Sequence, residues 1–245
     1  SAASDVYKRQ GKERMMLMAD NTFKRYELKY MLDREQYEQI MSEMIRYMQP
    51  DRFAHSQIIN IYFDTPSHRL IRDSIEKPVY KEKLRLRSYG VPDDDSEVFI
   101  ELKKKYKSVV YKRRLEVPEQ EAMDYLVGGQ PLHEDCQIGR EIDYFMQVYR
   151  DLEPAVVLSY ERDSYKGIDD PELRITFDYN ILWQNDDLTL QKEPYGHKVI
   201  PEYKVLMEIK MAGGFPLWLS HLLTKYGAYK TSFSKYGEAY KQMVG

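Results

Sequence analysis

Alternating charged and apolar residues mark several stretches of this sequence as β-strands with one ionic face. Between Lys83 and Arg87, three cations alternate with two leucines, so a strand would place all three cations on one side. Similar alternation recurs along the chain and predicts eight strands. These are Phe23–Met31, Ile58–Asp64, Tyr80–Tyr89, Glu97–Lys105, Val110–Val117, Val156–Tyr165, Glu172–Asp178 and Tyr203–Met211. The alternation is least regular in the segment that starts at Val156.

The ionic faces of these strands carry an excess of cations, although the whole chain has a net charge of −3. The cations are Arg25, Lys29, Lys83, Arg85, Arg87, Lys103, Lys112, Arg114, Arg162, Arg174 and Lys210. The acids are only Glu27, Glu101, Glu116, Asp178 and Glu208. A solvated face would mix the two signs more evenly. Because uncompensated charges are costly to bring together, the excess predicts a bound polyanion, whose phosphate oxygens arginine and lysine suit.

A few carboxylates among many cations are typical of sites where a divalent metal bridges protein and phosphate. Mg²⁺ or Mn²⁺ sites of this kind use one or two carboxylates together with oxygens of the substrate. Glu208 is the first candidate ligand, and Glu27 and Glu101 are further candidates. For each of them, a salt bridge to a neighbouring cation is an equally good interpretation.

Two architectures fit strands of this kind: an open sheet with a solvated ionic face, or a closed barrel with an ionic lumen. The charge excess favours the barrel. We therefore predict an α+β fold, an antiparallel eight-stranded tunnel-type β-barrel with a basic lumen, flanked by helices. A capping box of Asp33 and Gln36 predicts the start of the first helix. Further helices are expected at Glu119–Leu126, Cys136–Arg150, Pro216–Tyr226 and Phe233–Met243.

Other chemistries find little support. The single cysteine, Cys136, excludes an intramolecular disulfide, and the five histidines show no metal-ligand spacing. The sequence has no glycine-rich phosphate loop, no nucleophile elbow and no apolar run of membrane-spanning length. Residues 1–20 are interpreted as a disordered or non-native leader, and residues 21–245 as a single cytoplasmic domain.

Seven segments, in this order, resemble a known family. They are Tyr26–Tyr30, Leu84–Gly90, Glu101–Lys103, Tyr160–Arg162, Leu173–Asp178, Glu208–Lys210 and Phe233–Tyr236. Together they resemble the VTC (vacuolar transporter chaperone) polyphosphate polymerase domain, over about Thr22 to Met243. That domain belongs to the triphosphate tunnel metalloenzymes, which also include CYTH-type triphosphatases.

The resemblance implies a tunnel in which the terminal phosphate of ATP is transferred to polyphosphate with Mn²⁺ or Mg²⁺. It implies that Glu208 holds the metal, and that Arg114 and Lys210 assist the cations that bind phosphate. Those cations would be Lys29, Arg85, Arg87, Lys103, Lys112, Arg162, Arg174 and Lys235. The sequence departs from the family at Ser232, where a second lysine is common.

Three alternatives remain open at this stage. The same tunnel could admit water and act as a triphosphatase, or it could bind polyphosphate or another triphosphate without turnover. In an open sheet, the basic face could instead bind a protein or nucleic acid. The expected partners are ATP and polyphosphate or another triphosphate, with no DNA, and the chain is compatible with a membrane-bound partner.

Overall fold

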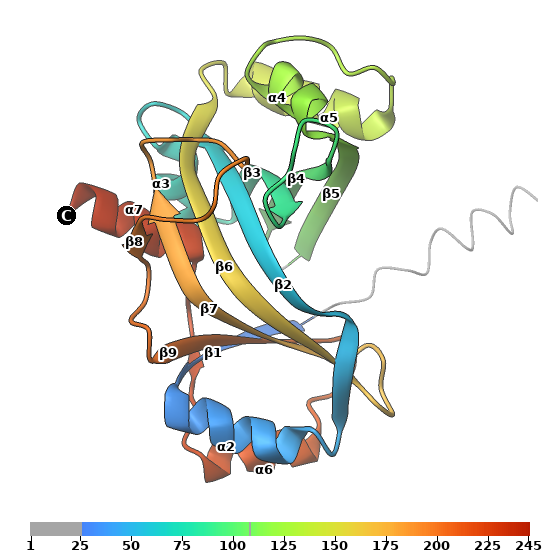
Figure 1. The fold of residues 1–245 in the computed structure, drawn as a ribbon, viewed down its shortest axis with the longest axis vertical. Coiled ribbons are helices and arrows are strands. Elements are labelled where there is room, and N and C mark those ends of the chain that lie inside the picture. The colour runs from blue at the N-terminus through green and yellow to red at the C-terminus, as the bar shows by residue number, and fades with distance from the viewer. Residues whose placement is uncertain (1–25, 108) are drawn as a thin grey trace, which may run out of the picture.

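Ten strands form one curled antiparallel sheet that brings the alternating segments of the sequence side by side (Figure 1). The computed structural model describes residues 26–107 and 109–245. The strand order is β10-β1-β9-β7-β6-β2-β3-β4-β5, and β8 pairs with β7. The strands are β1 (Tyr26–Asp33), β2 (Met48–Asp64), β3 (Tyr80–Tyr89), β4 (Glu97–Tyr106), β5 (Val109–Pro118), β6 (Glu153–Gly167), β7 (Arg174–Gln184), β8 (His197–Lys198), β9 (Lys204–Met211) and β10 (Lys230–Thr231).

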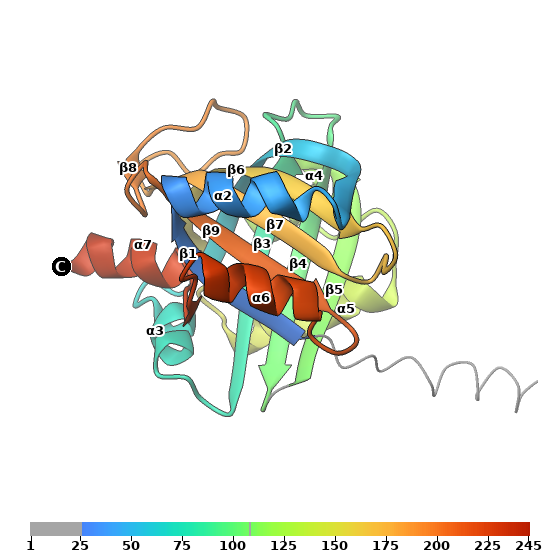
Figure 2. The same cartoon turned by 90° about the horizontal axis from the view of Figure 1, so that it is seen from below.

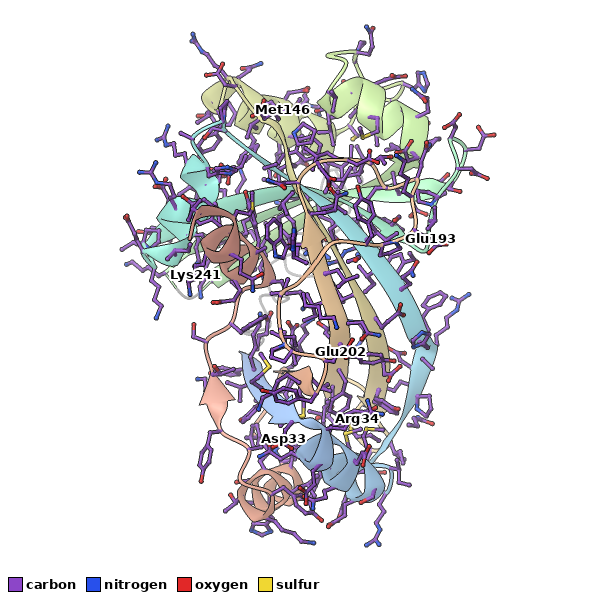
Figure 3. The ribbon with its side chains drawn as sticks, turned by 60° about the vertical axis from the view of Figure 1, so that its left-hand side comes forward. Asp33, Arg34, Met146, Glu193, Glu202 and Lys241 are labelled. Carbon is purple, nitrogen blue, oxygen red and sulfur yellow. The ribbon has the colours of Figure 1, made fainter. Side chains whose placement is uncertain are left out.

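Six helices within the described residues cover the sheet at its two ends and one side. They are α2 (Arg34–Met44), α3 (Arg69–Ile75), α4 (Glu119–Leu126), α5 (Gln137–Val148), α6 (Leu217–Lys225) and α7 (Lys235–Val244). Helices α2 and α6 lie together at one end, α4 and α5 at the other, and α3 and α7 at the side (Figures 1 and 2). Figure 3 shows the two end layers from the side, with Asp33 and Arg34 at one end and Met146 at the other. The capping box predicted at Asp33 is confirmed.

The outer, convex face of the sheet is apolar beneath the two end layers. One core contains Leu84, Leu86 and Ile100 under α4 and α5, and a second contains Phe177 and Ile209 under α2 and α6. All five side chains are fully buried. Because successive residues of a strand point to opposite faces, their charged neighbours must face the concave side. The alternation in the sequence is thereby explained.

A third apolar core lies on the concave side, where α7 packs against β2, β6 and β7. It includes Val156, Leu158 and Tyr160, which precede Arg162 on β6. The concave face of β6 is therefore apolar beside α7 and ionic beyond it. This division explains why Arg162 shares its parity with apolar residues.

The expected closed eight-stranded barrel is wrong in two respects, since the sheet has ten strands and is not closed. Within the described residues, no backbone pairing joins β5 to β1 or β10. A side-chain contact spans this gap instead, with Glu27 Oε2 of β1 lying 4.0 Å from Lys103 Nζ of β4.

Several smaller differences complete the comparison with the sequence. Strand β2 begins at Met48, ten residues before the predicted start at Ile58, and α3 was not expected. Arg25 and the proposed leader at residues 1–20 lie outside the described residues. In the part of the chain that the structure describes, no helix combines the length and apolarity needed to span a membrane.

Candidate functional site: two cation clusters on the concave face

The first cluster surrounds Glu101, in the middle of the β3–β5 half of the sheet. The register places Glu101 between Arg85 on β3 and Arg114 on β5. Both guanidinium groups donate two hydrogen bonds to its carboxylate at 2.5–2.8 Å, and Lys112 Nζ lies 2.6 Å away. The side chain of Glu101 is 1% exposed. Burial alone would raise its pKa, but Arg85, Arg87 and Lys112 hold the pKa far below its usual range.

Neutral side chains from β2 and β6 fix the orientation of the two β3 arginines. Arg85 Nη1 donates to the Tyr62 hydroxyl at 2.9 Å, and Arg87 donates to Asn60 Oδ1 at 2.9 Å and to the Tyr160 hydroxyl at 3.2 Å. Burial would raise the pKa of Tyr62, yet the charges of Arg85, Lys83 and Arg87 lower it to about 8. The arginines are therefore held in place before any ligand binds.

The second cluster surrounds two acids, Asp178 on β7 and Glu208 on β9. Asp178 is fully buried and accepts short hydrogen bonds of 2.5–2.7 Å from Arg162 and from Lys235, the first residue of α7. Burial would raise its pKa, but Lys235 and Arg162 lower it. Asp178 thus ties α7 to the sheet and directs Lys235 into the concave face.

Glu208 is contacted more loosely than either of the other buried acids. Lys29 Nζ lies 3.3 Å and Lys235 Nζ 3.5 Å from its carboxylate, whereas Arg162 and Lys210 lie at 3.9 Å. Despite burial, these cations hold the pKa of Glu208 well below its ordinary value. Glu208 is therefore an ionised carboxylate whose ion-pair contacts within the described residues are all 3.3 Å or longer, in contrast to Glu101 and Asp178.

Glu27 lies near Glu208 and faces Lys29 at 3.6 Å and Lys103 at 4.0 Å. Its side chain is 38% exposed, so solvent or a ligand can reach it. Among the described residues, no group of three or more His, Cys, Asp and Glu is arranged to hold a metal ion. The donor set that fits a hard divalent cation is accordingly Glu208, with Glu27 beside it and substrate oxygens completing the coordination.

The predicted site residues are brought together to different degrees. Arg85, Arg87, Lys112 and Arg114 surround Glu101, whereas Lys29, Arg162, Lys210 and Lys235 surround Glu208. Lys103 of β4 lies on the same concave face, with its Nζ 4.0 Å from Glu27 Oε2 of β1. Arg174 shares the concave face but lies at the start of β7, where its 59% exposed side chain points to Asp51 at 3.8 Å.

Three residues of this region, Lys83, Asp178 and Tyr62, are not among the predicted site residues. Lys83 donates to the Ser234 hydroxyl at 3.2 Å, at the N-cap of α7. Burial and nearby lysines lower its pKa to about 8. Asp178 and Lys83 belong to the alternating ionic faces of the sequence, and this alternation could have identified them as site residues. No sequence pattern identifies Tyr62 as a site residue, since the part of β2 around it carries no alternating charges.

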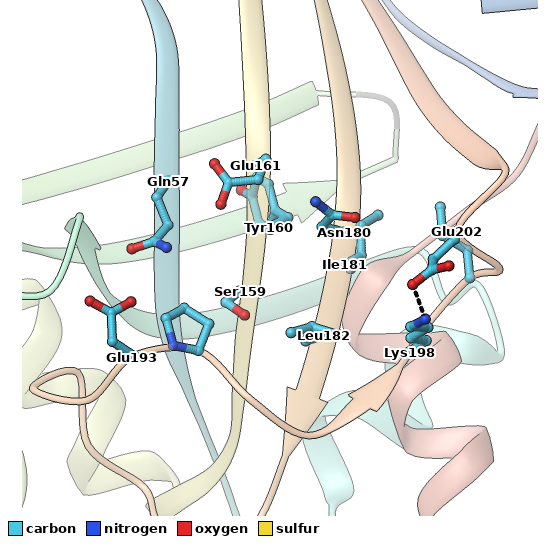
Figure 4. A pocket seen from close by; sticks show the side chains of 12 residues that line it. Gln57, Ser159, Tyr160, Glu161, Asn180, Ile181, Leu182, Glu193, Lys198 and Glu202 are labelled. Carbon is cyan, nitrogen blue, oxygen red and sulfur yellow. Dashed lines mark hydrogen bonds and ion pairs between the residues drawn. The ribbon is translucent and has the colours of Figure 1, made fainter. Parts of the chain in front are cut away.

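A separate pocket of about 300 Å³ lies between β6, β7 and the segment leading to β9 (Figure 4). Its lining includes Glu161, Glu193 and Glu202, and its one lysine, Lys198, is hydrogen-bonded to Glu202. Acids outnumber cations there. The pocket is therefore unsuited to phosphate, and the concave face remains the candidate site.

Solved structures with the same fold define the class to which this curled, basic sheet belongs. A Bacillus halodurans protein provisionally assigned as an adenylate cyclase matches with TM-score 0.53 and 14% identity, covering 85% of this chain and 92% of that one. A Hippeastrum protein, provisionally assigned as an adenylyl cyclase and described as having a dominant triphosphatase activity, matches with TM-score 0.52 and 15% identity. That match covers 86% of this chain and 92% of the other. The chain has the CYTH-like triphosphate-tunnel fold.

A match to a family model identifies the family of this chain within that class. Residues 24–244 match the VTC domain, and the chain belongs to the VTC domain family. Among curated proteins we found no match. The family that the seven segments resemble is therefore confirmed.

Proposed function

We propose that this protein is a metal-dependent phosphotransferase that adds the terminal phosphate of ATP to a polyphosphate chain. The observation that carries the proposal is the pair of cation clusters on one concave face, where no described residue makes a short hydrogen bond to Glu208. Membership of the VTC domain family supports the proposal, as does the triphosphate-tunnel fold.

In this proposal the cations of the two clusters bind and orient the phosphates. Arg85 and Arg162 would donate to phosphate oxygens the N–H groups that Glu101, Tyr62 and Asp178 leave available. Lys29 and Lys235 would act as point charges. Phosphoryl transfer needs no covalent nucleophile, since positioning and charge stabilisation supply most of its catalysis. Glu208, with Glu27 beside it, would hold Mn²⁺ or Mg²⁺, which would neutralise phosphate oxygens. The rows of fixed cations would align the end of the acceptor chain with the γ-phosphate.

A second candidate function is hydrolysis of a triphosphate by the same site. One specific observation favours it: the Hippeastrum protein of the same fold is described as having a dominant triphosphatase activity. The side chain of Glu27 is 38% exposed, so water can reach one of the two carboxylates proposed to hold the metal. The two functions differ only in whether water or a phosphate chain accepts the phosphoryl group.

The test is incubation with ATP and either Mn²⁺ or Mg²⁺, with products separated on a gel that resolves polyphosphate from orthophosphate. Long polyphosphate that disappears in Glu208→Gln supports the polymerase. Orthophosphate alone identifies the triphosphatase, and no consumption of ATP contradicts both. The matched control is Glu116→Gln, because Glu116 is an exposed glutamate of the same face on β5.

A further inference from the structure

The positive charge of the concave face is not evenly distributed. Next to the row of Arg85, Glu101 and Arg114, the register places Lys83, Lys103 and Lys112 abreast on β3, β4 and β5. The next row contains Lys81 and Lys105, and Lys107 follows in the turn where its N–H donates to Val79 O at 2.6 Å. Acids are therefore mixed with cations near Glu101 but absent from the rows beyond it. We call Lys81, Lys105 and Lys107 the outer lysines.

The outer lysines lack acidic partners within the described part of the chain. Lys81 donates to the backbone oxygen of Ser74 at 3.1 Å, and Lys107 Nζ lies 5.5 Å from the centre of the Tyr106 ring. No ion pair to a carboxylate involves any of the three in residues 26–107 and 109–245. The sequence itself contains no Asp or Glu from Lys103 to Leu115. Within the residues that the structure describes, no carboxylate therefore pairs with their charge.

Lys81 and Lys105 are register partners on β3 and β4, so their charges lie close together. Burial lowers the pKa of Lys81, and the charges of Lys105, Lys103 and Lys77 lower it further. Such a cluster is unfavourable for a folded protein unless an anion neutralises it. Successive rows lie about 7 Å apart along a strand, so the outer lysines extend the basic surface about 14 Å beyond Arg85. A triphosphate between the two clusters would not reach that far.

We propose that the outer lysines bind the distal phosphates of a long linear polyphosphate whose end lies between the Glu101 and Glu208 clusters. The proposal rests on the function proposed above and adds to it a dependence of affinity on chain length. The outer lysines continue the cation clusters along the same strands, which favours polyphosphate as the ligand. RNA would need further surface contacts for its bases. Lysine also suits a chain that carries charge at every unit and offers no base to read.

The experiment compares tripolyphosphate with long-chain polyphosphate by titration calorimetry at two salt concentrations. The variant is Lys81→Gln with Lys105→Gln and Lys107→Gln; the double variant without Lys81→Gln is the alternative if the triple one fails to fold. The control, Lys192→Gln with Lys198→Gln and Lys204→Gln, removes the same charge between the end of β7 and the first residue of β9. A single-stranded RNA of matched charge is titrated in parallel.

We expect the outer variant to bind long polyphosphate about tenfold more weakly, with a logarithmic salt slope reduced by about 2. Binding of tripolyphosphate should change less than about twofold, and the control should match the wild type. Unchanged long-chain affinity, equal weakening of both ligands, or tighter binding of RNA than of polyphosphate would overturn the inference. If the wild type binds neither phosphate ligand, the proposed function itself fails.

Discussion

The two cation clusters use their carboxylates differently. Glu101 is saturated, because four guanidinium hydrogen bonds and a lysine contact occupy its oxygens at 2.5–2.8 Å. Glu208 is surrounded by as many cations, yet its nearest, Lys29 and Lys235, lie 3.3 and 3.5 Å away. A carboxylate that accepts short bonds from all sides has a structural role. One that stays ionised without short bonds can still take a metal ion or yield to a phosphate.

The two carboxylates therefore differ in role, although the cations of both clusters are proposed to bind phosphate. The Glu101 cluster orients arginines that would otherwise repel one another, and so stabilises the β3–β5 half of the sheet. The Glu208 cluster lies at the junction of β1, β7, β9 and α7, where α7 brings in Lys235. We therefore expect substitutions in the two clusters to affect different measurements.

The largest effect on stability is expected from Glu101→Gln. Loss of this buried charge leaves several cations uncompensated, and should lower the free energy of unfolding by about 3–5 kcal/mol. Denaturant unfolding measures the change, and added tripolyphosphate should restore part of it. Glu116→Gln is the control and should change stability by less than about 0.5 kcal/mol. A Glu101→Gln variant as stable as the wild type would show that the clusters do not differ in this way.

Glu208→Gln should affect turnover instead. The amide preserves the shape of the side chain but removes the charge that the metal requires, so the rate should fall about a hundredfold or more. Steady-state assays of ATP consumption measure the loss, and circular dichroism checks that the fold is kept. Full activity in this variant would exclude Glu208 from the reaction centre.

The substitution Lys83→Met should have opposite effects on stability and on phosphate binding. The pKa of Lys83 is lowered to about 8 by burial and neighbouring lysines. Between pH 8 and 10.5 the unfolded state binds this proton more readily, so wild-type stability should rise with pH there. At pH 7 the variant should be more stable by about 1 kcal/mol and should bind tripolyphosphate several-fold more weakly. A less stable variant would contradict this account of the lysine rows.

The smallest effect is a pH dependence of binding. Lys83 and Lys112 have pKa values lowered to about 8, and Tyr62 has its pKa lowered to about 8 as well. From pH 7 to 9 the lysines lose positive charge and the phenol gains negative charge. Affinity for tripolyphosphate should therefore fall a few-fold over this range, and less steeply in Lys83→Met. Titrations at both pH values measure it, and an affinity that rises with pH would contradict the prediction.

Strict alternation made much of the fold predictable. The predicted bounds of β3 and α4 agree with the structure, because each has one face in the same apolar core. Helix α3 was missed because its N-cap residue, His68, makes no side-chain cap; instead Asp64, at the end of β2, accepts hydrogen bonds from the N–H groups of Leu70 and Ile71. Closure of the barrel was wrong, since alternation gives the face of each residue but not the pairing of the outermost strands.

Alternation likewise predicted the side of the sheet on which each described cation lies. It did not predict how far along the strands the cation lies from the two clusters. Arg174 shares the face of Arg162 and still lies beside Asp51 at the far end of β7. The positions of Ile181 and Trp183 depend on a bulge near Asn180, whose backbone is left-handed with φ 48°. Beyond it these two side chains face α7, whereas Asp178 before it remains in the ionic cluster. No period in the sequence marks that change.

The most direct test of the difference between the two clusters is titration with Mn²⁺ in the presence of tripolyphosphate, with free Mn²⁺ followed by electron paramagnetic resonance. We predict that the wild type and Glu116→Gln bind the ion in the same proportion, and that Glu208→Gln loses this binding. Binding that persists unchanged in Glu208→Gln would contradict the assignment of Glu208 as the metal-binding carboxylate.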